Sequence, residues 1–194
     1  MKILLPTIIA KAISVIRHDG IFVYPTDTLY GLGGDATKKI VVEKIYALKT
    51  RDKDKPLSII LPSIAAIKKY CLVNSAQEKI LKKYLPGPYT FILRLRKNMV
   101  LPATNNGKIG VRIPDYQPIV RLCKMIDVPI ITTSANISGN GDARRISEVD
   151  KKILNAVDFI INAGETKYAE GSTVVDLIDK KILRKGAGKF NIYL

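Results

Sequence analysis

Apolar residues recur along the chain at two spacings, and the spacing predicts which segments are helices and which are strands. Apolar side chains three or four residues apart predict helices, and short apolar or alternating runs predict strands. The helices expected on this basis cover residues 7–17, 37–48, 63–71, 75–84, 115–126 and 147–155. The strands expected cover residues 21–24, 57–61, 91–95, 108–113, 128–132, 157–161, 173–178 and 181–185.

The order of these elements predicts the fold class. Helices and strands are mixed, but the strict β-α-β alternation of a doubly wound sheet is missing. Paired helices within 63–84 and a C-terminal hairpin that turns at Asp179-Lys180 favour an α/β fold on a mixed sheet. Polar or glycine-rich loops are expected at 26–35 and 133–145. Because no repeat or linker divides the chain, a single domain is expected over residues 1–194.

Composition narrows the class of protein. The chain has 194 residues, of which 47% are hydrophobic and 25% charged, as in globular proteins. No stretch approaches the roughly 18 apolar residues of a membrane span, and no signal peptide is recognised. The two cysteines, Cys71 and Cys123, lack C-x-x-C spacing and predict a reduced, cytoplasmic setting. The single histidine, His18, excludes a histidine-rich zinc site and is expected at the C-terminus of a helix.

The charge balance predicts an anionic partner. Lys and Arg number 32 against 17 Asp and Glu, a formal net charge of +15. Lys49, Arg51, Lys53 and Lys55 occupy every second position, and in an extended segment they would face one way, roughly 6.6–7 Å apart. Such a row suits a polyphosphate or a nucleic-acid backbone. A solvated loop with self-compensating charges is the alternative.

Two glycine motifs resemble nucleotide-binding loops but lack their context. Residues 31–36 match G-x-G-x-x-A, yet Pro25 and five more residues separate the motif from the preceding strand. These glycines instead favour a tight backbone path beside a ligand. Residues 186–189 resemble the end of a P-loop, but Leu183 and Phe190 stand where that loop needs Gly and Ser or Thr.

Polar side chains gather at the ends of two predicted strands. The segment 132–139 brings together four hydroxyls and Asn136 after an apolar strand, where α/β folds bind ligands. Arg112 ends another strand just before Pro114. An arginine there can bind a carboxylate through two hydrogen bonds, or form a surface ion pair with Asp115.

An ordered series of motifs resembles a known family. The segments are PTDTLYGLG (25–33), LKTR (48–51) with KPL (55–57), PGPYT (86–90), VRIP (111–114), TSANISG (133–139) and STVVD (172–176). In this order they resemble the YrdC family, the threonylcarbamoyl-AMP synthases, over about residues 5–188.

The resemblance implies a fold and a reaction. The fold is α/β, with a twisted mixed sheet and flanking helices around a basic concave cleft. The reaction converts L-threonine, bicarbonate and ATP into threonylcarbamoyl-AMP and pyrophosphate. A separate transferase complex then uses the product to modify tRNA. Mg²⁺ is expected on the ATP phosphates.

The resemblance also implies binding residues. Threonine-binding residues would be Thr28, Arg112, Thr132 and Ser172. ATP-binding residues would be Lys49, Arg51, Lys55, Lys108, Ser134, Asn136, Asp142 and Arg184. Ile60 stands where some relatives carry a histidine, so that threonine contact is absent or replaced. No protein nucleophile is needed, since positioning and charge neutralisation suffice.

Two other functions remain open on the sequence. A non-catalytic protein that binds tRNA or double-stranded RNA fits the net charge, but aromatic residues make up only 7% and there is no Trp, which argues against base stacking. A carbamoyl-transfer module of a hydrogenase-maturation protein is the other alternative. Such modules belong to longer chains with zinc-finger cysteines, which this sequence lacks.

Overall fold

The computed structural model describes residues 6–52, 54–104, 106–137, 139 and 141–191. The helices are α1 (Pro6–Arg17), α2 (Lys39–Lys49), α3 (Ile64–Tyr70), α4 (Ser75–Tyr84), α5 (Gln117–Ile126) and α6 (Lys151–Ala156), with a 3₁₀ helix at Ile146–Glu148. The strands are β1 (Phe22–Pro25), β2 (Tyr30–Gly33), β3 (Ser58–Ile60), β4 (Cys71–Leu72), β5 (Tyr89–Leu95), β6 (Lys108–Arg112), β7 (Ile130–Ser134), β8 (Phe159–Ile160), β9 (Thr173–Asp176) and β10 (Lys181–Arg184).

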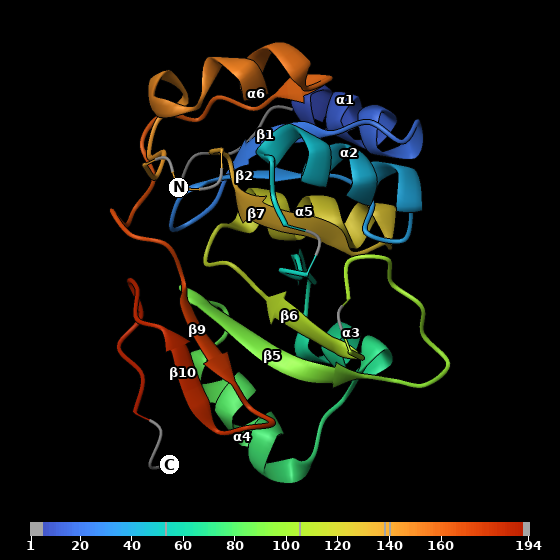
Figure 1. Ribbon diagram of the computed structural model, residues 1–194, viewed down its shortest axis with the longest axis vertical. Coiled ribbons are helices and arrows are strands. Elements are labelled where there is room, and N and C mark those ends of the chain that lie inside the picture. Colours follow the sequence, from blue (N-terminus) through green and yellow to red (C-terminus); the bar gives the residue numbers. More distant parts are fainter. Residues whose placement is uncertain (1–5, 53, 105, 138, 140, 192–194) are drawn as a thin grey trace.

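The strands within these ranges form one mixed sheet (Figure 1). The order across the sheet is β10-β9-β5-β6-β3-β7-β2-β1-β8, and β4 pairs with β5 off this path. The pairs β1–β8, β3–β6 and β5–β9 are parallel, whereas the other strand pairs are antiparallel. The predicted α/β class with a mixed sheet is therefore confirmed.

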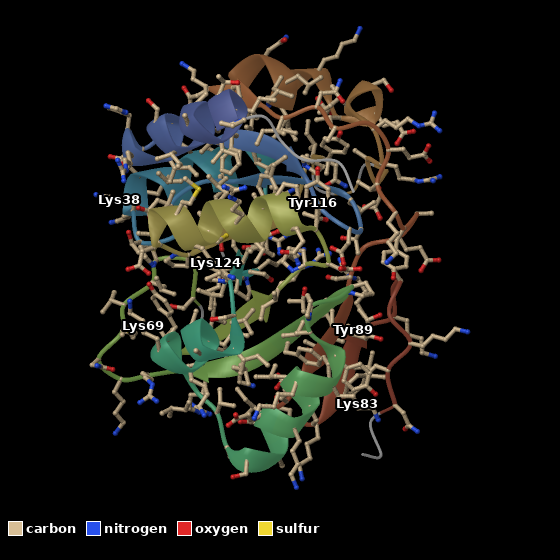
Figure 2. All side chains as sticks on the ribbon, turned by 180° about the vertical axis from the view of Figure 1, so that it is seen from behind. Lys38, Lys69, Lys83, Tyr89, Tyr116 and Lys124 are labelled. Atoms are coloured by element: carbon tan, nitrogen blue, oxygen red, sulfur yellow. The ribbon has the colours of Figure 1, made fainter. Side chains whose placement is uncertain are left out.

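Helices cover both faces of the sheet and bury two hydrophobic clusters. One cluster packs α2, through Val41 and Ile45, against strand residues such as Ile59. The other packs α1 and α5, through Ile16 and Ile119, against the opposite face. The two views show this arrangement, because α2 lies in front in Figure 1 and α1 and α5 lie in front in Figure 2. The part of the sheet formed by β1, β3 and β7 is thus held between two apolar layers.

The predicted elements match the observed ones except at a few places. The expected loop 26–35 contains strand β2, and the expected helix 147–155 is divided into a 3₁₀ turn and α6. Strand β4 was not predicted. Glycines at 31 and 33 hid β2, because glycine disfavours strands unless the packing requires it. A side chain at Gly33 would place its Cβ 2.0 Å from the Ile131 carbonyl oxygen, so the packing does require it.

Thr37, the first residue of the expected helix 37–48, is not part of α2. Its hydroxyl instead donates to the Asp35 carboxylate (2.7 Å), and the helix begins two residues later, at Lys39. At the end of α1, His18 does follow the last helical residue, and its Nδ1 lies 2.8 Å from the Ser14 carbonyl oxygen.

Both cysteines are free and buried. Burial raises the pKa of Cys71 to about 12 and also raises that of Cys123, so both stay as unreactive thiols. Within the described ranges, no helix is long and apolar enough to cross a membrane.

Candidate functional site

A cavity of about 620 Å³ lies over the middle strands of the sheet, against the chain between α2 and β3. Most of the binding residues expected from the sequence line it. They are Thr28, Arg51, Lys55, Arg112, Thr132, Ser134, Asp142, Ser172 and Arg184. Segments far apart in the sequence therefore meet at one site.

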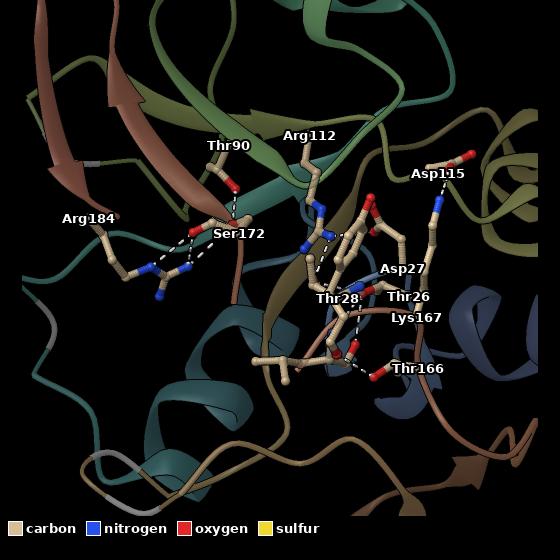
Figure 3. A network of polar contacts seen from close by, with 12 residues as sticks. Thr26, Asp27, Thr28, Thr90, Arg112, Asp115, Thr166, Lys167, Ser172 and Arg184 are labelled. Atoms are coloured by element: carbon tan, nitrogen blue, oxygen red, sulfur yellow. Dashed lines mark hydrogen bonds and ion pairs between the residues drawn. The ribbon is translucent and has the colours of Figure 1, made fainter. Parts of the chain in front are cut away.

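A buried ion pair lies at one side of the cavity (Figure 3). Arg112, the last residue of β6, donates from Nη2 to the Asp27 carboxylate and to the Thr28 hydroxyl (2.6 Å). The Arg112 side chain is 7% exposed and that of Asp27 is 0% exposed. The alternative of a surface ion pair between Arg112 and Asp115 is wrong, because Arg112 pairs with Asp27 and Asp115 pairs with Lys167 (3.0 Å).

The turn between β1 and β2 fixes the partners of Arg112. The Thr26 hydroxyl accepts hydrogen bonds from the backbone N–H groups of Thr28 (3.1 Å) and Leu29 (3.3 Å), and donates to the Leu29 carbonyl oxygen (2.8 Å). It also lies 3.1 Å from the Thr28 hydroxyl. The turn therefore holds the Thr28 hydroxyl toward Arg112.

A second cluster of polar side chains comes from β5, from β10 and from the residue just before β9 (Figure 3). The Ser172 hydroxyl lies 2.8 Å from the Thr90 hydroxyl. Arg184 donates from Nη2 to the Ser172 carbonyl oxygen (2.8 Å) and hydroxyl (3.2 Å). Burial lowers the pKa of Arg184, which nevertheless stays protonated at neutral pH because a guanidinium titrates far above it. Arg184 therefore brings a positive charge to the cavity wall.

The expected row of four evenly spaced cations is wrong. Lys49 is the last residue of α2, and Thr50 then adopts a left-handed conformation (φ 50°), so the segment is not extended. Lys49 is buried, with 1% of its surface exposed, and does not line the cavity. Lys53 lies outside the described residues. Only Arg51 and Lys55 of the row are therefore seen at the cavity.

The Lys49 ammonium group instead holds the loop after β7. It donates to the carbonyl oxygens of Ser134 (2.5 Å) and Asn136 (2.5 Å) and to the Asn136 side-chain oxygen (3.1 Å). Burial lowers its pKa to about 8, and the nearby Arg51 charge adds to this effect. An ammonium group has three N–H donors, so Lys49 has none left for a phosphate.

Asn136 is not among the residues that line the cavity. Its side-chain oxygen accepts from the Ser134 hydroxyl (2.6 Å), and its amide donates to the Gly141 carbonyl oxygen (3.2 Å). Asn136 thus orients Ser134, which does line the cavity.

Lys108 lies away from the cavity. Its ammonium group pairs with Asp179 (2.9 Å) and Asp176 (3.3 Å), and the Asp179 hydrogen bond is the main reason its pKa is raised. The structure does not bring Lys108 to the other expected ATP-binding residues.

Arg51 shapes the wall that carries Lys55. Its Nε donates to the Lys55 carbonyl oxygen (3.1 Å), and its Nη2 donates to that of Pro56 (3.2 Å). This arrangement fixes the backbone just before β3 while both charged groups stay at the cavity.

Several lining residues were not predicted from the sequence, among them Ser58, Thr90 and Gly110. Thr90 was part of a quoted motif but had no role assigned. Ser58 and Gly110 lie inside apolar strand runs, where their polarity and small size were the only available signals. Ile60 is fully buried and does not line the cavity.

The described residues contain no group of three or more His, Cys, Asp or Glu side chains that could hold a metal ion. Two carboxylates, Asp54 and Asp142, line the cavity. Because Mg²⁺ commonly uses one or two carboxylates together with substrate phosphates, this donor set fits a metal that arrives on a nucleotide.

Fold and site together define an α/β protein with a cationic, hydroxyl-lined ligand cavity. The family model Sua5/YciO/YrdC, described as "Telomere recombination", matches residues 14–186. The chain belongs to this family.

Relatives whose names state an activity match this chain over most of its length. A protein of Methanocaldococcus jannaschii, named as a putative threonylcarbamoyl-AMP synthase, is 42% identical over 168 residues, which cover 87% of this chain and 79% of the relative. The structure of Pyrococcus abyssi Sua5 complexed with L-threonine is 29% identical, with a TM-score of 0.89. That match covers 95% of this chain and 56% of the P. abyssi chain.

E. coli YciO, whose crystal structure is known, is a third relative. It is 26% identical, with a TM-score of 0.90, and the match covers 100% of this chain and 96% of YciO. The chain therefore spans little more than half of P. abyssi Sua5 but nearly the whole of YciO.

Proposed function

We propose that this protein is an L-threonylcarbamoyladenylate synthase, a nucleotidyltransferase that uses L-threonine, bicarbonate and ATP. One observation carries the proposal. A single cavity has Arg112 and Thr28 at one side and three further cations, Arg51, Lys55 and Arg184, elsewhere on its wall. An amino acid and a polyphosphate can therefore bind close enough to react. The names of the relatives support the same activity.

Arg112 would bind the substrate carboxylate. A guanidinium has five N–H donors, and the contacts of Arg112 with Asp27 and Thr28 use only its Nη2 group. Thr132 and Ser172 would complete the amino-acid end of the cavity with neutral hydrogen-bonding groups.

Arg51, Lys55 and Arg184 would bind the phosphates of ATP. Charge-assisted hydrogen bonds to phosphate are roughly twice as strong as neutral ones, and the cations would offset the charge that develops on the leaving pyrophosphate. Ser134, oriented by Asn136, would contact the nucleotide or the intermediate.

The reaction needs no protein nucleophile. The threonine amine attacks the carbon of bicarbonate, and water leaves, which gives a carbamate. A carbamate oxygen then attacks the α-phosphorus of ATP, the bond to the β-phosphate oxygen breaks, and pyrophosphate departs. Positioning and charge neutralisation are the contributions expected of the protein.

We propose that Mg²⁺ enters with ATP and supplies charge neutralisation on its phosphates. Asp54 and Asp142 are the carboxylates of the cavity wall that would approach it. We further propose that the product passes to a tRNA threonylcarbamoyl transferase complex in the cytoplasm.

A non-catalytic RNA-binding function has less support. It fits the net charge, but the row of cations that would also suit a nucleic-acid backbone is broken, because Lys49 is buried and bound to the loop after β7. Many lysines lie on the surface, for example Lys69, Lys83 and Lys124 (Figure 2). Direct contact with tRNA or double-stranded RNA would then be an additional, salt-dependent property of this surface.

Mass spectrometry of the reaction product tests the proposal. Purified protein with ATP, Mg²⁺, bicarbonate and L-threonine should yield threonylcarbamoyl-AMP, and pyrophosphate release should require threonine. Equal release without threonine, or no release under any condition, would contradict the synthase function.

A further inference from the structure

Ser58 is one of the residues that line the cavity. As the first residue of β3, it pairs in register with Gly110 of β6 on one side and with Thr132 of β7 on the other. Residues directly paired across strands point to the same face of the sheet. Ser58, Gly110 and Thr132 all line the cavity.

Within the described part of the chain, the Ser58 hydroxyl makes no hydrogen bond. Other hydroxyls of the cavity are paired: Thr28 with Thr26 and Arg112, Thr90 with Ser172, and Ser134 with Asn136. Thr132 forms a side-chain hydrogen bond with Tyr24. Thr133 also lines the cavity, but strand alternation directs its side chain away from the face of Thr132. Among the described residues, Ser58 has no side-chain hydrogen-bond partner and is not fully buried.

The neighbouring glycine keeps space around this hydroxyl. A Cβ atom at Gly110 would lie 2.5 Å from the Ser58 Oγ and 3.1 Å from its Cβ. The backbone conformation does not call for glycine, since Gly110 is not among the residues with positive φ. The absent side chain therefore leaves the Ser58 hydroxyl open to the cavity.

The position of Ser58 matches one group of the substrate. Arg112 is two residues beyond Gly110 on β6, which is roughly 6.6–7 Å along the strand. Lys55 and Ser58 are three residues apart in the chain, and both line the cavity. In an α-amino acid held by Arg112, the amine is one carbon from the carboxylate and must face the phosphates in order to react. Along the chain, Ser58 lies between Lys55 and Ile60, the β3 residue that is paired with Arg112.

We propose that the Ser58 hydroxyl contacts the amine of the amino-acid substrate and orients it between Arg112 and the phosphate-binding cations. This role rests on the proposed function. A hydroxyl can accept a hydrogen bond from the amine without carrying charge. A carboxylate at this place would favour the protonated amine, whose lone pair cannot attack bicarbonate. Ser58 is thus a positioning residue suited to a neutral nucleophile.

Steady-state kinetics of Ser58→Ala, Ser58→Thr and Ser14→Ala test the role. Ser58→Ala should lower kcat/KM for L-threonine about 3- to 10-fold, the effect of one lost neutral hydrogen bond. KM for ATP and the melting temperature should not change. Ser58→Thr keeps the hydroxyl and should retain most of the wild-type value. Ser14 is exposed on α1, so Ser14→Ala should behave as wild type.

The outcomes separate this role from the proposed function. An active wild type with an unaffected Ser58→Ala variant would overturn the role of Ser58 and leave the synthase function intact. Equal losses of kcat/KM for threonine and for ATP, together with a lower melting temperature, would show that Ser58 has only a structural role. If the wild type releases no pyrophosphate, calorimetric titration with L-threonine decides instead. Equal affinities of wild type and Ser58→Ala, or no binding to either, would then overturn the role.

Discussion

The Arg112 guanidinium is held by the buried carboxylate of Asp27. Asp27 lies behind the cavity wall and is fully buried, whereas Arg112 reaches the cavity. The pair joins the turn after β1 to the end of β6, two segments 85 residues apart in the chain. Asp27 therefore offsets part of the cost of burying the Arg112 charge and fixes its direction.

Loss of the Asp27 charge should destabilise the fold. Removing one partner of a buried ion pair costs about 3–5 kcal/mol, because the other charge stays buried and uncompensated. Denaturant unfolding of Asp27→Asn should show a loss within or just below this range. Asp115→Asn is the matched control, since the exposed pair of Asp115 with Lys167 contributes about 0–1 kcal/mol. Equal effects of the two substitutions would contradict the role given to Asp27.

Arg112→Ala should weaken threonine binding much more than ATP binding. Loss of a charge-assisted contact to a carboxylate costs roughly 1.5–3 kcal/mol, or about 10- to 150-fold in affinity. Calorimetric titration with each ligand measures the two effects separately. An unchanged threonine affinity in a folded variant would remove Arg112 from the binding site.

Arg51→Ala and Lys55→Ala should each slow pyrophosphate release by at least about tenfold, since each charge-assisted contact to phosphate is worth about 1.5 kcal/mol or more. Lys124→Ala is the control, because Lys124 is exposed on α5, on the face shown in Figure 2. Similar losses of tRNA affinity in all three variants, with unchanged turnover of ATP, would favour RNA binding over catalysis.

The buried Lys49 should make stability depend on pH. Its folded-state pKa of about 8 lies below the ordinary lysine value of roughly 10.4. Between these values the unfolded chain binds more protons than the folded one, so the contribution of Lys49 to the free energy of unfolding rises with pH through this window. This contribution falls away as the pH drops through about 8.

Unfolding at pH 7 and pH 10 of wild type and Lys49→Met measures this effect. The wild type should gain stability relative to the variant by up to about 3 kcal/mol at the higher pH. Lys44→Met, an exposed change on the same helix, should show no such difference. A constant gap between wild type and Lys49→Met would contradict a depressed pKa.

The sequence predicted most elements and most of the cavity wall, because both follow from local signals. Hydrophobic spacing predicts α5 and β6. A charged residue at the end of a strand, such as Arg112 at the end of β6, indicates a ligand site. Lys49 could not be assigned, because a lysine at the end of a helix has the same local pattern whether its ammonium group is solvated or buried. Its partners, Ser134 and Asn136, lie more than 80 residues away.

The remaining errors have a similar origin. β2 was hidden because Gly31 and Gly33 have low strand propensity, and only their contacts with Tyr24 and Ile131 explain them. Lys108 was expected at the ATP site, but the β9–β10 hairpin brings Asp176 and Asp179 to it instead. Ser58 gave no signal within an apolar run, since its role depends on the register of β3 with β6 and β7.

ATP–pyrophosphate exchange tests the central claim most directly, because it reports reversible adenylate formation whether or not the product is released. Labelled pyrophosphate should enter ATP in the presence of protein and Mg²⁺ only when both L-threonine and bicarbonate are present. Exchange that does not depend on threonine, or no exchange while the protein still binds RNA, would contradict the assignment as a threonylcarbamoyl-AMP synthase.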